Sequence, residues 1–212
     1  MYKRQVLRYT DLHTSCVFCK SDNIKRLDEA MPIPGLVSGA IMASSSSKTP
    51  QMGQIAQGVE IGLYQWLLAS TVQGVATGAV GSGGCVGSMV VVPNAPLMET
   101  AFKSNGLVGV FAPVMWTPIM LGISQPYFFA GAVAGVGVGS FIGGIVGDPI
   151  LLTQLLVGSF TSVGILGVDR VRICTALGQG ISSHFLTTVA NGVVAGAPGP
   201  APSSSPFVGN FL

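Results

Sequence analysis

The chain has 212 residues, of which 49% are hydrophobic and only 8% are charged, and its formal net charge is +2. Soluble domains usually carry about 25% charged residues, so a free monomer with so little charged surface is expected to dissolve poorly. The near-neutral balance argues against binding to nucleic acid or to an anionic surface. Composition therefore favours a chain that is held inside an assembly or a membrane.

The first thirty residues differ from the rest in their charge. They hold ten of the eighteen charged residues, whereas the glycine-rich sequence from Met31 onward holds eight. Residues 1–5 resemble the translation of a sequencing adapter. We therefore interpret residues 1–30 as an extraneous or disordered segment and expect the authentic start at Met31.

Two cysteines in this segment have the spacing of half a zinc site. Cys16 and Cys19 are separated by two residues, and His13 lies nearby. A structural zinc site needs four ligands, usually two such pairs, and Cys85 and Cys174 stand alone in apolar sequence. The chain is therefore predicted to have no metal site, and four cysteines without a signal peptide give no argument for disulfides.

Residues 31–50 are predicted to form a short helix that ends at Ser44, followed by a polar linker to Pro50. Beyond them the chain repeats a pair of short glycine-containing segments, which we call the glycine marks. The copies are Gly62-Leu63 with Gly74–Gly78, Gly122-Ile123 with Gly135–Gly139, and Gly180-Ile181 with Gly192–Gly196. Self-similarity at a nearly fixed period indicates stacked structural units.

We therefore predict an α+β fold with about three tandem units of roughly 58–60 residues. Each unit would contain a Gly-containing helix, a Gly/Val β-hairpin and a second helix. The predicted units are residues 51–110, residues 111–168 and a truncated third unit, 169–212, which has a Pro/Ser-rich tail. The third unit lacks a second helix, and the helix before Ser44 is the candidate for that missing part.

In the first unit, residues 55–70 have helical length and composition. Residues 72–80 and 86–92 are predicted as the arms of a hairpin, because Gly-Ser-Gly-Gly between them is typical of a turn. Residues 97–105 are predicted as the second helix. Gly106 follows it, at the position where a left-handed conformation commonly ends a helix.

The second unit follows the same plan. Its first helix is predicted over residues 111–125, interrupted by Pro113 and Pro118. Its hairpin arms are predicted at residues 132–139 and 141–146. Asp148-Pro149 is a strong helix-start pair, with a side-chain acceptor followed by proline in the first turn, and it opens a second helix over residues 150–163.

The third unit is predicted to open at Asp169, another candidate helix cap. Its helix has one apolar face, formed by Val171, Cys174, Gly178, Ile181 and Phe185 at spacings of three and four residues. Residues 189–197 are predicted as a strand, and residues 207–212 as its second arm.

The residues that could support catalysis are few and scattered. Glu60 and Glu99 lie on different segments, and His184 has no carboxylate or cysteine at ligand spacing, so it is predicted to be a packed or surface histidine. Trp66 and Trp116 are predicted to be packing anchors. An enzyme needs positioned acids, bases, nucleophiles or a metal, so we predict no enzyme, no catalytic residue and no cofactor.

A membrane protein is the alternative interpretation. Residues 61–98, 106–147 and 149–168 contain no charged residue, and apolar runs of about 18 or more are the usual sign of a transmembrane helix. The chain would then be a small polytopic protein with Gly-rich helices. Frequent Gly and Pro argue against it, as does the strand-like alternation of Gly135–Gly139, because an isolated strand in lipid leaves backbone groups unpaired.

The tripled glycine pattern, with Gly106-Leu-Val-Gly-Val110 and Gly164-Ile-Leu-Gly-Val168 between copies, gives residues 31–212 a family resemblance. This part resembles a group of virion structural proteins from contractile-tailed phages of marine bacteria. The resemblance implies a virion component, assembled in the host cytoplasm and packed against copies of itself or other structural proteins. The resemblance carries over no functional residue. Nucleic acid is not expected as a partner, because Lys103, Arg170 and Arg172 do not form a basic stripe.

Overall fold

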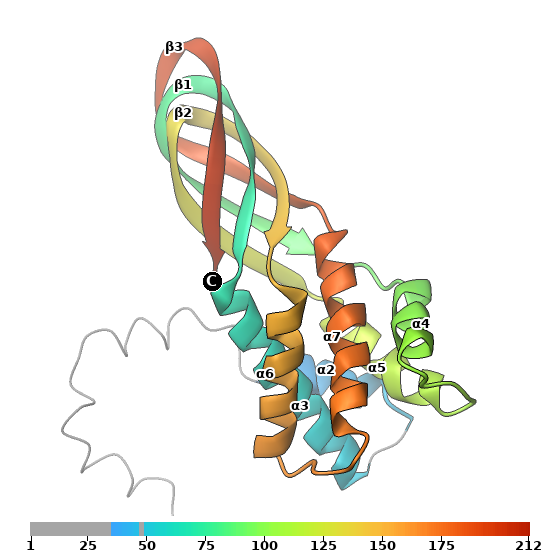
Figure 1. The fold of residues 1–212 in the computed structure, drawn as a ribbon. Helices are drawn as coiled ribbons and strands as arrows, with labels where there is room; N and C mark the ends of the chain where they lie inside the picture. The colour runs from blue at the N-terminus through green and yellow to red at the C-terminus, as the bar shows by residue number, and fades with distance from the viewer. Residues whose placement is uncertain (1–34, 47–48) are drawn as a thin grey trace, which may run out of the picture. The chain divides into compact units, whose positions relative to one another are not determined.

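The computed structural model describes residues 35–46 and 49–212. The helices are α2 Leu36–Ser44, α3 Pro50–Ala69, α4 Ala95–Ser104, α5 Ala112–Ile123, α6 Pro149–Ser162 and α7 Arg170–Leu186, and the strands are β1 Thr71–Val90, β2 Pro126–Val146 and β3 Ala190–Phe211. All belong to one compact unit, 32–212. The strands gather at one end of this unit and the helices at the other (Figure 1). The predicted α+β class is confirmed, whereas residues 1–30, with Cys16 and Cys19, lie outside the described part.

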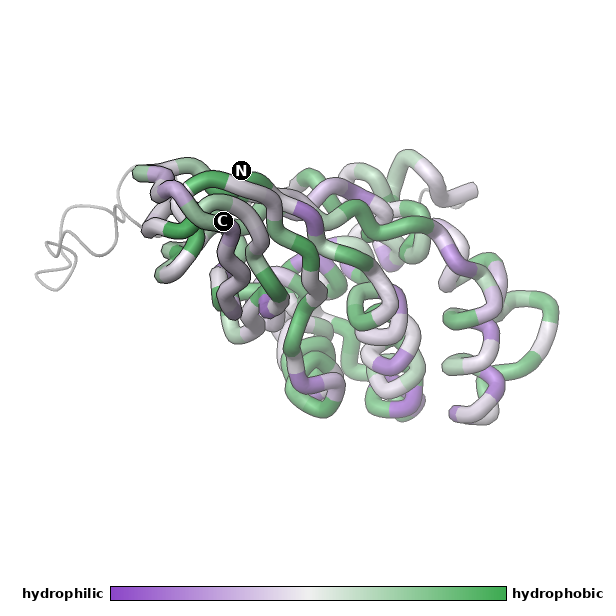
Figure 2. The backbone as a smooth tube through the Cα atoms, turned by 90° about the horizontal axis from the view of Figure 1, so that it is seen from above, coloured by the Kyte–Doolittle hydropathy of each residue, from purple (hydrophilic) through white to green (hydrophobic). Residues whose placement is uncertain are grey.

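The helices and strands differ in charge. The three strands contain no Asp, Glu, Lys or Arg. In Figure 2 their backbone is mostly pale or green, and much of the strongly hydrophilic colour lies on the helices. In the described part, the charged residues lie in the helices or directly beside them: Glu60, Glu99, Lys103, Asp148, Asp169, Arg170 and Arg172.

Several helix ends follow the predicted local chemistry. Asp148 Oδ1 accepts a hydrogen bond from the Ile150 N–H at 2.8 Å at the start of α6. Gly106 and Gly164 follow α4 and α6 with φ of 69° and 87°, a left-handed region that suits glycine. Local sequence therefore sets where these helices begin and end.

Two local predictions need correction. α5 runs without a break from Ala112 to Ile123, with Pro118 inside it. Pro113 lies in the first turn, where a missing N–H costs nothing, and the buried side chains of the helix offset the single hydrogen bond that Pro118 removes. Asp169 precedes α7 but accepts no capping hydrogen bond. Its carboxylate lies 3.6 Å from the Arg172 guanidinium instead.

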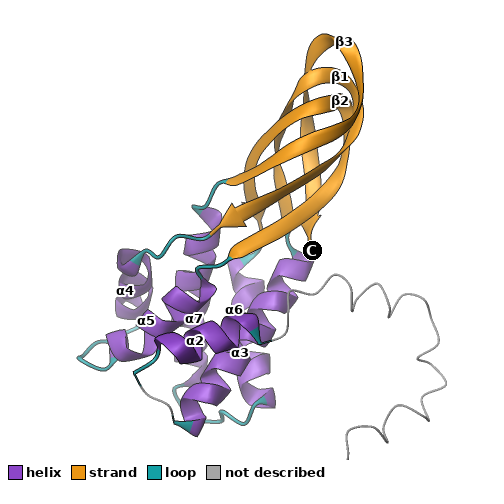
Figure 3. Ribbon diagram, turned by 180° about the vertical axis from the view of Figure 1, so that it is seen from behind, coloured by secondary structure: helices purple, strands orange, loops and turns teal. Residues whose placement is uncertain are grey.

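The three predicted hairpins are wrong. Each is one long strand that bends near its middle (Figure 3), and its two halves do not pair with each other. Val72, in the first half of β1, pairs with Ile145 of β2 on one side and with Gly209 of β3 on the other. Both edges of this half-strand are therefore occupied by other strands, so the turn-like glycines at 81–84 make a bend rather than a hairpin.

The strands form a closed sheet in which half-strands from different strands alternate. The half-strands follow in the order 71–79, 138–146, 190–198, 81–90, 126–136 and 202–211, which returns to 71–79. Every neighbouring pair is antiparallel and joins the first half of one strand to the second half of another. The two halves of each strand therefore lie on opposite sides of the closed sheet.

The interior of the sheet is filled by side chains from all three strands. The second halves contribute Cys85, Phe141 and Phe207, all buried. The Phe141 and Phe207 rings are 4.7 Å apart between centroids. A glycine lies against each of these three residues: Gly74 against Phe141, Gly131 against Phe207 and Gly192 against Cys85.

This register corrects the predicted alignment of the glycine marks. Gly131 is the residue of β2 that occupies the position held by Gly74 in β1 and by Gly192 in β3. The repeated sequence pattern instead predicts Gly135 at this position of β2. Gly74 pairs with Gly143 and Gly192 pairs with Gly87, and a Cβ added at Gly131 would lie 2.9 Å from the Gly209 Cα. Glycine is needed because two backbones approach too closely for a side chain.

At the tip of the sheet the bent strands cross over one another. A Cβ on Gly137 of β2 would overlap the carbonyl of Ala197 in β3, and a Cβ on Gly81 of β1 would lie 3.0 Å from Gly137 itself. Gly199 of β3 lies against Val80 of β1. The bends are therefore stacked, and the tip depends on glycines at the crossing points.

Three of the helix contacts, α3 with α6, α5 with α2 and α7 with α4, are built in the same way. In each pair a glycine of one helix receives a large buried side chain of the other. The contacts are Gly62 with Leu156, Gly122 with Ile41 and Gly180 with Met98. The glycines are the first marks of the repeated sequence, so this pattern encodes close helix contacts.

Candidate interaction surface

The buried Glu60 has a structural partner set. Its carboxylate accepts hydrogen bonds from the N–H groups of Gly35 and Val37, both at 3.0 Å, and from the Ser38 hydroxyl at 2.7 Å. These donors lie at the start of α2, where helix N–H groups have no intrahelical partner. Glu60 of α3 therefore caps α2 across the helix contact. Because the Glu60 carboxylate accepts these three hydrogen bonds, it is not free to accept a proton from a substrate.

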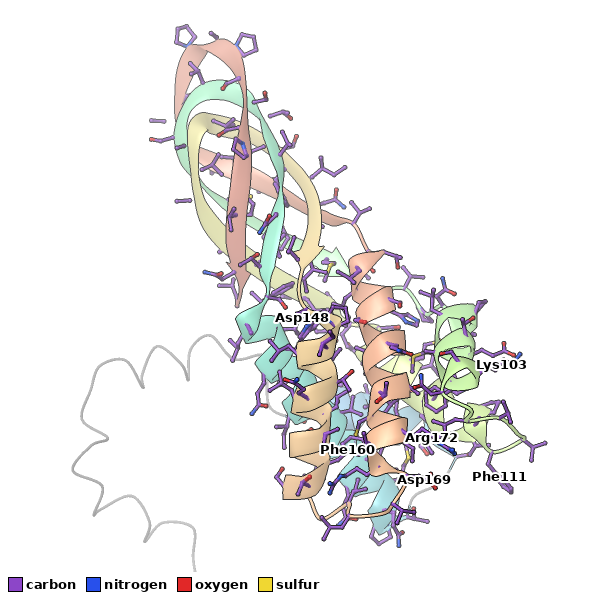
Figure 4. All side chains as sticks on the ribbon, in the orientation of Figure 1. Lys103, Phe111, Asp148, Phe160, Asp169 and Arg172 are labelled. Carbon is purple, nitrogen blue, oxygen red and sulfur yellow. The ribbon has the colours of Figure 1, made fainter. Side chains whose placement is uncertain are left out.

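The exposed charged residues form short-range pairs. Lys103 pairs with Glu99 one turn earlier in α4, and Arg172 pairs with Asp169. Figure 4 shows Lys103 projecting from α4 and Asp148 at the junction of β2 and α6. Exposed pairs of this kind contribute little to stability, and these side chains do not converge on one site.

His184 is buried, and both of its ring nitrogens are occupied. Nε2 accepts the Asn94 N–H at 3.1 Å, and Nδ1 lies 2.7 Å from the Gly180 carbonyl, to which it donates. Burial lowers the pKa of His184 because desolvation disfavours the charged imidazolium. The Asn94 N–H also favours the neutral ring, since it can bond only to an unprotonated nitrogen. His184 therefore ties the segment after β1 to α7, and it is not available as a base.

A pocket of about 540 Å³ opens beside this histidine. Its polar lining includes Ser88, Asn94, Thr187, Thr188 and Asn191. These are neutral hydroxyl and amide groups. His184 also lines the pocket, but both of its ring nitrogens are occupied and cannot activate a neighbouring hydroxyl. The pocket can hold a small polar molecule by hydrogen bonds, but its lining supplies no catalytic pair.

The described cysteines and tryptophans are packing residues. Cys85 and Cys174 are buried free thiols, and burial raises the pKa of Cys174 to about 12 and that of Cys85 above its usual value. Trp66 and Trp116 are buried, and Trp66 Nε1 donates to the Asp148 carbonyl at 2.8 Å. Within residues 35–46 and 49–212, no group of three or more His, Cys, Asp or Glu side chains could hold a metal ion.

The closed sheet presents a large apolar surface to solvent, which we call the outer apolar face. It consists of the exposed side chains Val75, Val80, Val86, Val90, Phe128, Val138, Ile142, Val146, Val193, Val208 and Leu212. Scattered apolar side chains are normal on protein surfaces, but here they lie on strands that contain no charge at all. Large exposed apolar areas mark sites of interaction.

Part of this face is built from a segment that occurs once in each strand. The three copies are Val86-Gly-Ser-Met-Val90, Ile142-Gly-Gly-Ile-Val146 and Val208-Gly-Asn-Phe-Leu212. In each copy the first and fifth side chains are exposed and the fourth is buried inside the sheet. This motif does not follow the period of about 58–60 residues that relates the glycine-containing segments, because its copies are spaced 56 and 66 residues apart. The sequence prediction therefore did not include it.

A second apolar area lies on two loops of the helical group. Val108 and Val110 follow α4, and Leu166 and Val168 follow α6; all four are largely exposed. Phe111 is equally exposed and projects outward beside the first loop (Figure 4). The two loops are the Gly-Leu-Val-Gly-Val segment at 106–110 and the Gly-Ile-Leu-Gly-Val segment at 164–168. These similar loops therefore also leave apolar side chains exposed.

No protein-family model, curated protein or solved structure matches this chain. In the part of the chain that the structure describes, no helix combines the length and the apolar character that a membrane crossing requires.

Proposed function

We propose that the chain is a non-enzymatic structural subunit of a large assembly, a virion component of the contractile-tailed phage type. It acts by packing against partner proteins or further copies of itself. The outer apolar face is the observation that supports this function, because its side chains lie on uncharged strands and remain exposed in the isolated chain. Burying such a surface against a partner is favourable by roughly 25 cal/mol per Å².

We further propose that the chain is built from three tandem units, residues 51–110, 111–168 and 169–212. In place of a hairpin, each unit contributes one bent strand to the shared sheet. The helix contacts support this division, because Met98 and Leu156 lie 58 residues apart and Ile41 lies 57 residues before Met98. α2 then serves as the second helix of the third unit, packed on α5 through Ile41.

The test of assembly is sedimentation of the chain when it is produced together with the genes that flank its own. We expect the native chain to move with a fast-sedimenting complex, without detergent. Val86→Lys puts a charge on the outer apolar face and is expected to shift the chain to slow fractions. Thr100→Lys adds the same charge to an exposed position of α4 and should leave sedimentation unchanged.

Two results would contradict the proposal. One is a native chain that stays monomeric in the presence of its neighbours. The other is a chain that pellets with membranes and is released only by detergent, which would favour the polytopic membrane protein instead. Thermal unfolding of both variants serves as a control, since an exposed surface substitution should change stability by no more than about 0.5 kcal/mol.

A further inference from the structure

We propose that the outer apolar face is enclosed by three identical chains of a homotrimeric partner, whose three-fold axis follows the axis of the closed sheet. This inference rests on the proposed structural function and specifies the partner.

The first observation is the alternating order of the half-strands. Each second half lies between the first halves of the other two strands. A rotation by one third of a turn therefore places the second half of β1 on that of β2, and then on that of β3. The interior follows the same rotation, because Cys85, Phe141 and Phe207 each contact one glycine of a first half.

The second observation is that six of the exposed side chains, two from each copy of the repeated segment, obey this rotation too. Val86, Ile142 and Val208 are 55%, 60% and 56% exposed. Val90 and Val146 end the second halves of β1 and β2, and Leu212 directly follows that of β3; the three are 54%, 52% and 49% exposed. A single chain thus presents the same pair of apolar side chains three times around the sheet.

The third observation is the size of the surface. Large exposed apolar surfaces mark sites of interaction, and the outer apolar face has eleven exposed apolar side chains that are spread around the sheet. A partner must therefore approach from several sides to cover it.

A homotrimer meets these conditions better than the other candidates. Three identical chains can make the same contact with each sector, because cyclic symmetry repeats one contact at equal rotations. A partner without symmetry would meet three similar surfaces in three different ways. A lipid surface would cover one side and has no preference for three equal sectors.

The closed sheet also limits the kind of contact. Val86 already pairs on both sides, with Ala130 and Val193, and Ile142 does so with Val75 and Asn191. A partner strand therefore cannot be added beside these residues. The contact must be made by side chains. We therefore expect each partner chain to present an apolar, uncharged surface to the pairs Val86/Val90, Ile142/Val146 and Val208/Leu212.

The experiment places the photo-crosslinking amino acid p-benzoylphenylalanine at Val86, Ile142 or Val208, one position at a time. The full chain is produced with its flanking genes and irradiated, and crosslinked peptides are identified by mass spectrometry. We expect all three positions to capture the same peptide of the same partner, with yields within about twofold of each other. Native mass spectrometry should give one copy of this chain with three copies of the partner. The same amino acid at Thr100 in α4 is the control and should not capture that peptide.

Several outcomes would overturn the inference: different partner peptides at the three positions, crosslinks to lipid or to a second copy of this chain, or no crosslink at any of them. If the chain still sediments in a large complex, only the trimeric partner is refuted. If it is also monomeric in sedimentation, the structural function fails with it.

Discussion

Gly122 of α5 lies directly against Ile41 of α2, so close that a Cβ on Gly122 would stand 2.9 Å from the Ile41 backbone nitrogen and overlap its side chain. The two residues are 81 positions apart. This contact joins the first described helix to the middle of the chain, and it needs a glycine because backbone atoms of the partner helix cannot move aside.

We expect Gly122→Ala to destabilise the fold by about 1–3 kcal/mol, since the added methyl group overpacks a buried contact. Gly158→Ala is the matched control. Gly158 lies in α6, and an added Cβ there would meet no atom within 4 Å, so alanine should stabilise that helix by about 0.5–1 kcal/mol. Urea unfolding measures both changes. Equal effects of the two substitutions would contradict the close contact.

Removing the carboxylate of Glu60 should weaken the start of α2. Glu60→Ala leaves the N–H groups of Gly35 and Val37 and the Ser38 hydroxyl without their acceptor, at an expected cost of about 3 kcal/mol or more. Hydrogen exchange should accelerate at Gly35 and Val37 before it does in α6. Glu99→Ala, which breaks an exposed pair with Lys103, should cost less than about 1 kcal/mol. Unchanged exchange at Val37 would refute the cap.

Stability should fall in mild acid because of His184. Burial lowers the pKa of this residue in the folded state, so the unfolded chain binds the proton more readily. The stabilising contribution is fully present above the unfolded pKa of about 6.5 and is lost as pH falls below it, by up to about 1.4 kcal/mol per pH unit, until the folded pKa is reached.

The measurement is the free energy of unfolding between pH 5 and 8 for the native chain and for His184→Gln, whose amide oxygen can still accept the Asn94 N–H. The two proteins differ only at this residue, so the difference between the two curves isolates His184. We expect the variant to lose part of the acid slope. Parallel curves would show that His184 does not titrate differently in the folded chain.

The stacked tip should be sensitive to a single methyl group. Gly137→Ala would overlap the carbonyl of Ala197, and we expect a loss of about 1–3 kcal/mol, or a fall in Tm of about 2–4 °C per kcal/mol. Gly84→Ala is the control, because a Cβ on Gly84 meets nothing within 4 Å and its φ is not left-handed. If Gly137→Ala melted like Gly84→Ala, the strands would not cross as closely as described.

The helices could be predicted from sequence because their signals are local. Asp148-Pro149 and the left-handed Gly106 set helix ends by short-range hydrogen bonds and backbone geometry. The glycine marks were also identified, although sequence did not reveal that Gly62 and Gly122 receive side chains from other helices.

The sheet could not be predicted in the same way, because its pairing is non-local. Residues 81–84 have the composition of a hairpin turn, but both edges of β1 are taken by β2 and β3. The sequence pattern predicted Gly135 in place of Gly131, an error of four residues. The reason is that the helices end at different distances after their first glycine mark. α5 ends one residue after Gly122, whereas α3 continues for seven residues after Gly62.

The candidate surface was missed for a related reason. Its motif, such as Val86-Gly-Ser-Met-Val90, recurs at unequal spacing because the segments between the three strands differ in length. A search for the short apolar pattern without a fixed period would have found it. Which of its residues face outward follows only from the register of the closed sheet.

The alternation of half-strands has a consequence for how this chain is made. Thr71 pairs with Val146 and with Asn210, so β1 leaves the ribosome long before either of its neighbours has been translated. During that interval a valine- and glycine-rich segment with unsatisfied backbone groups is exposed to other nascent chains, and segments of this kind aggregate readily. Productive folding therefore depends on keeping β1 apart from other chains until β3 has emerged, which makes slow folding and a need for chaperones the expected cost of this topology.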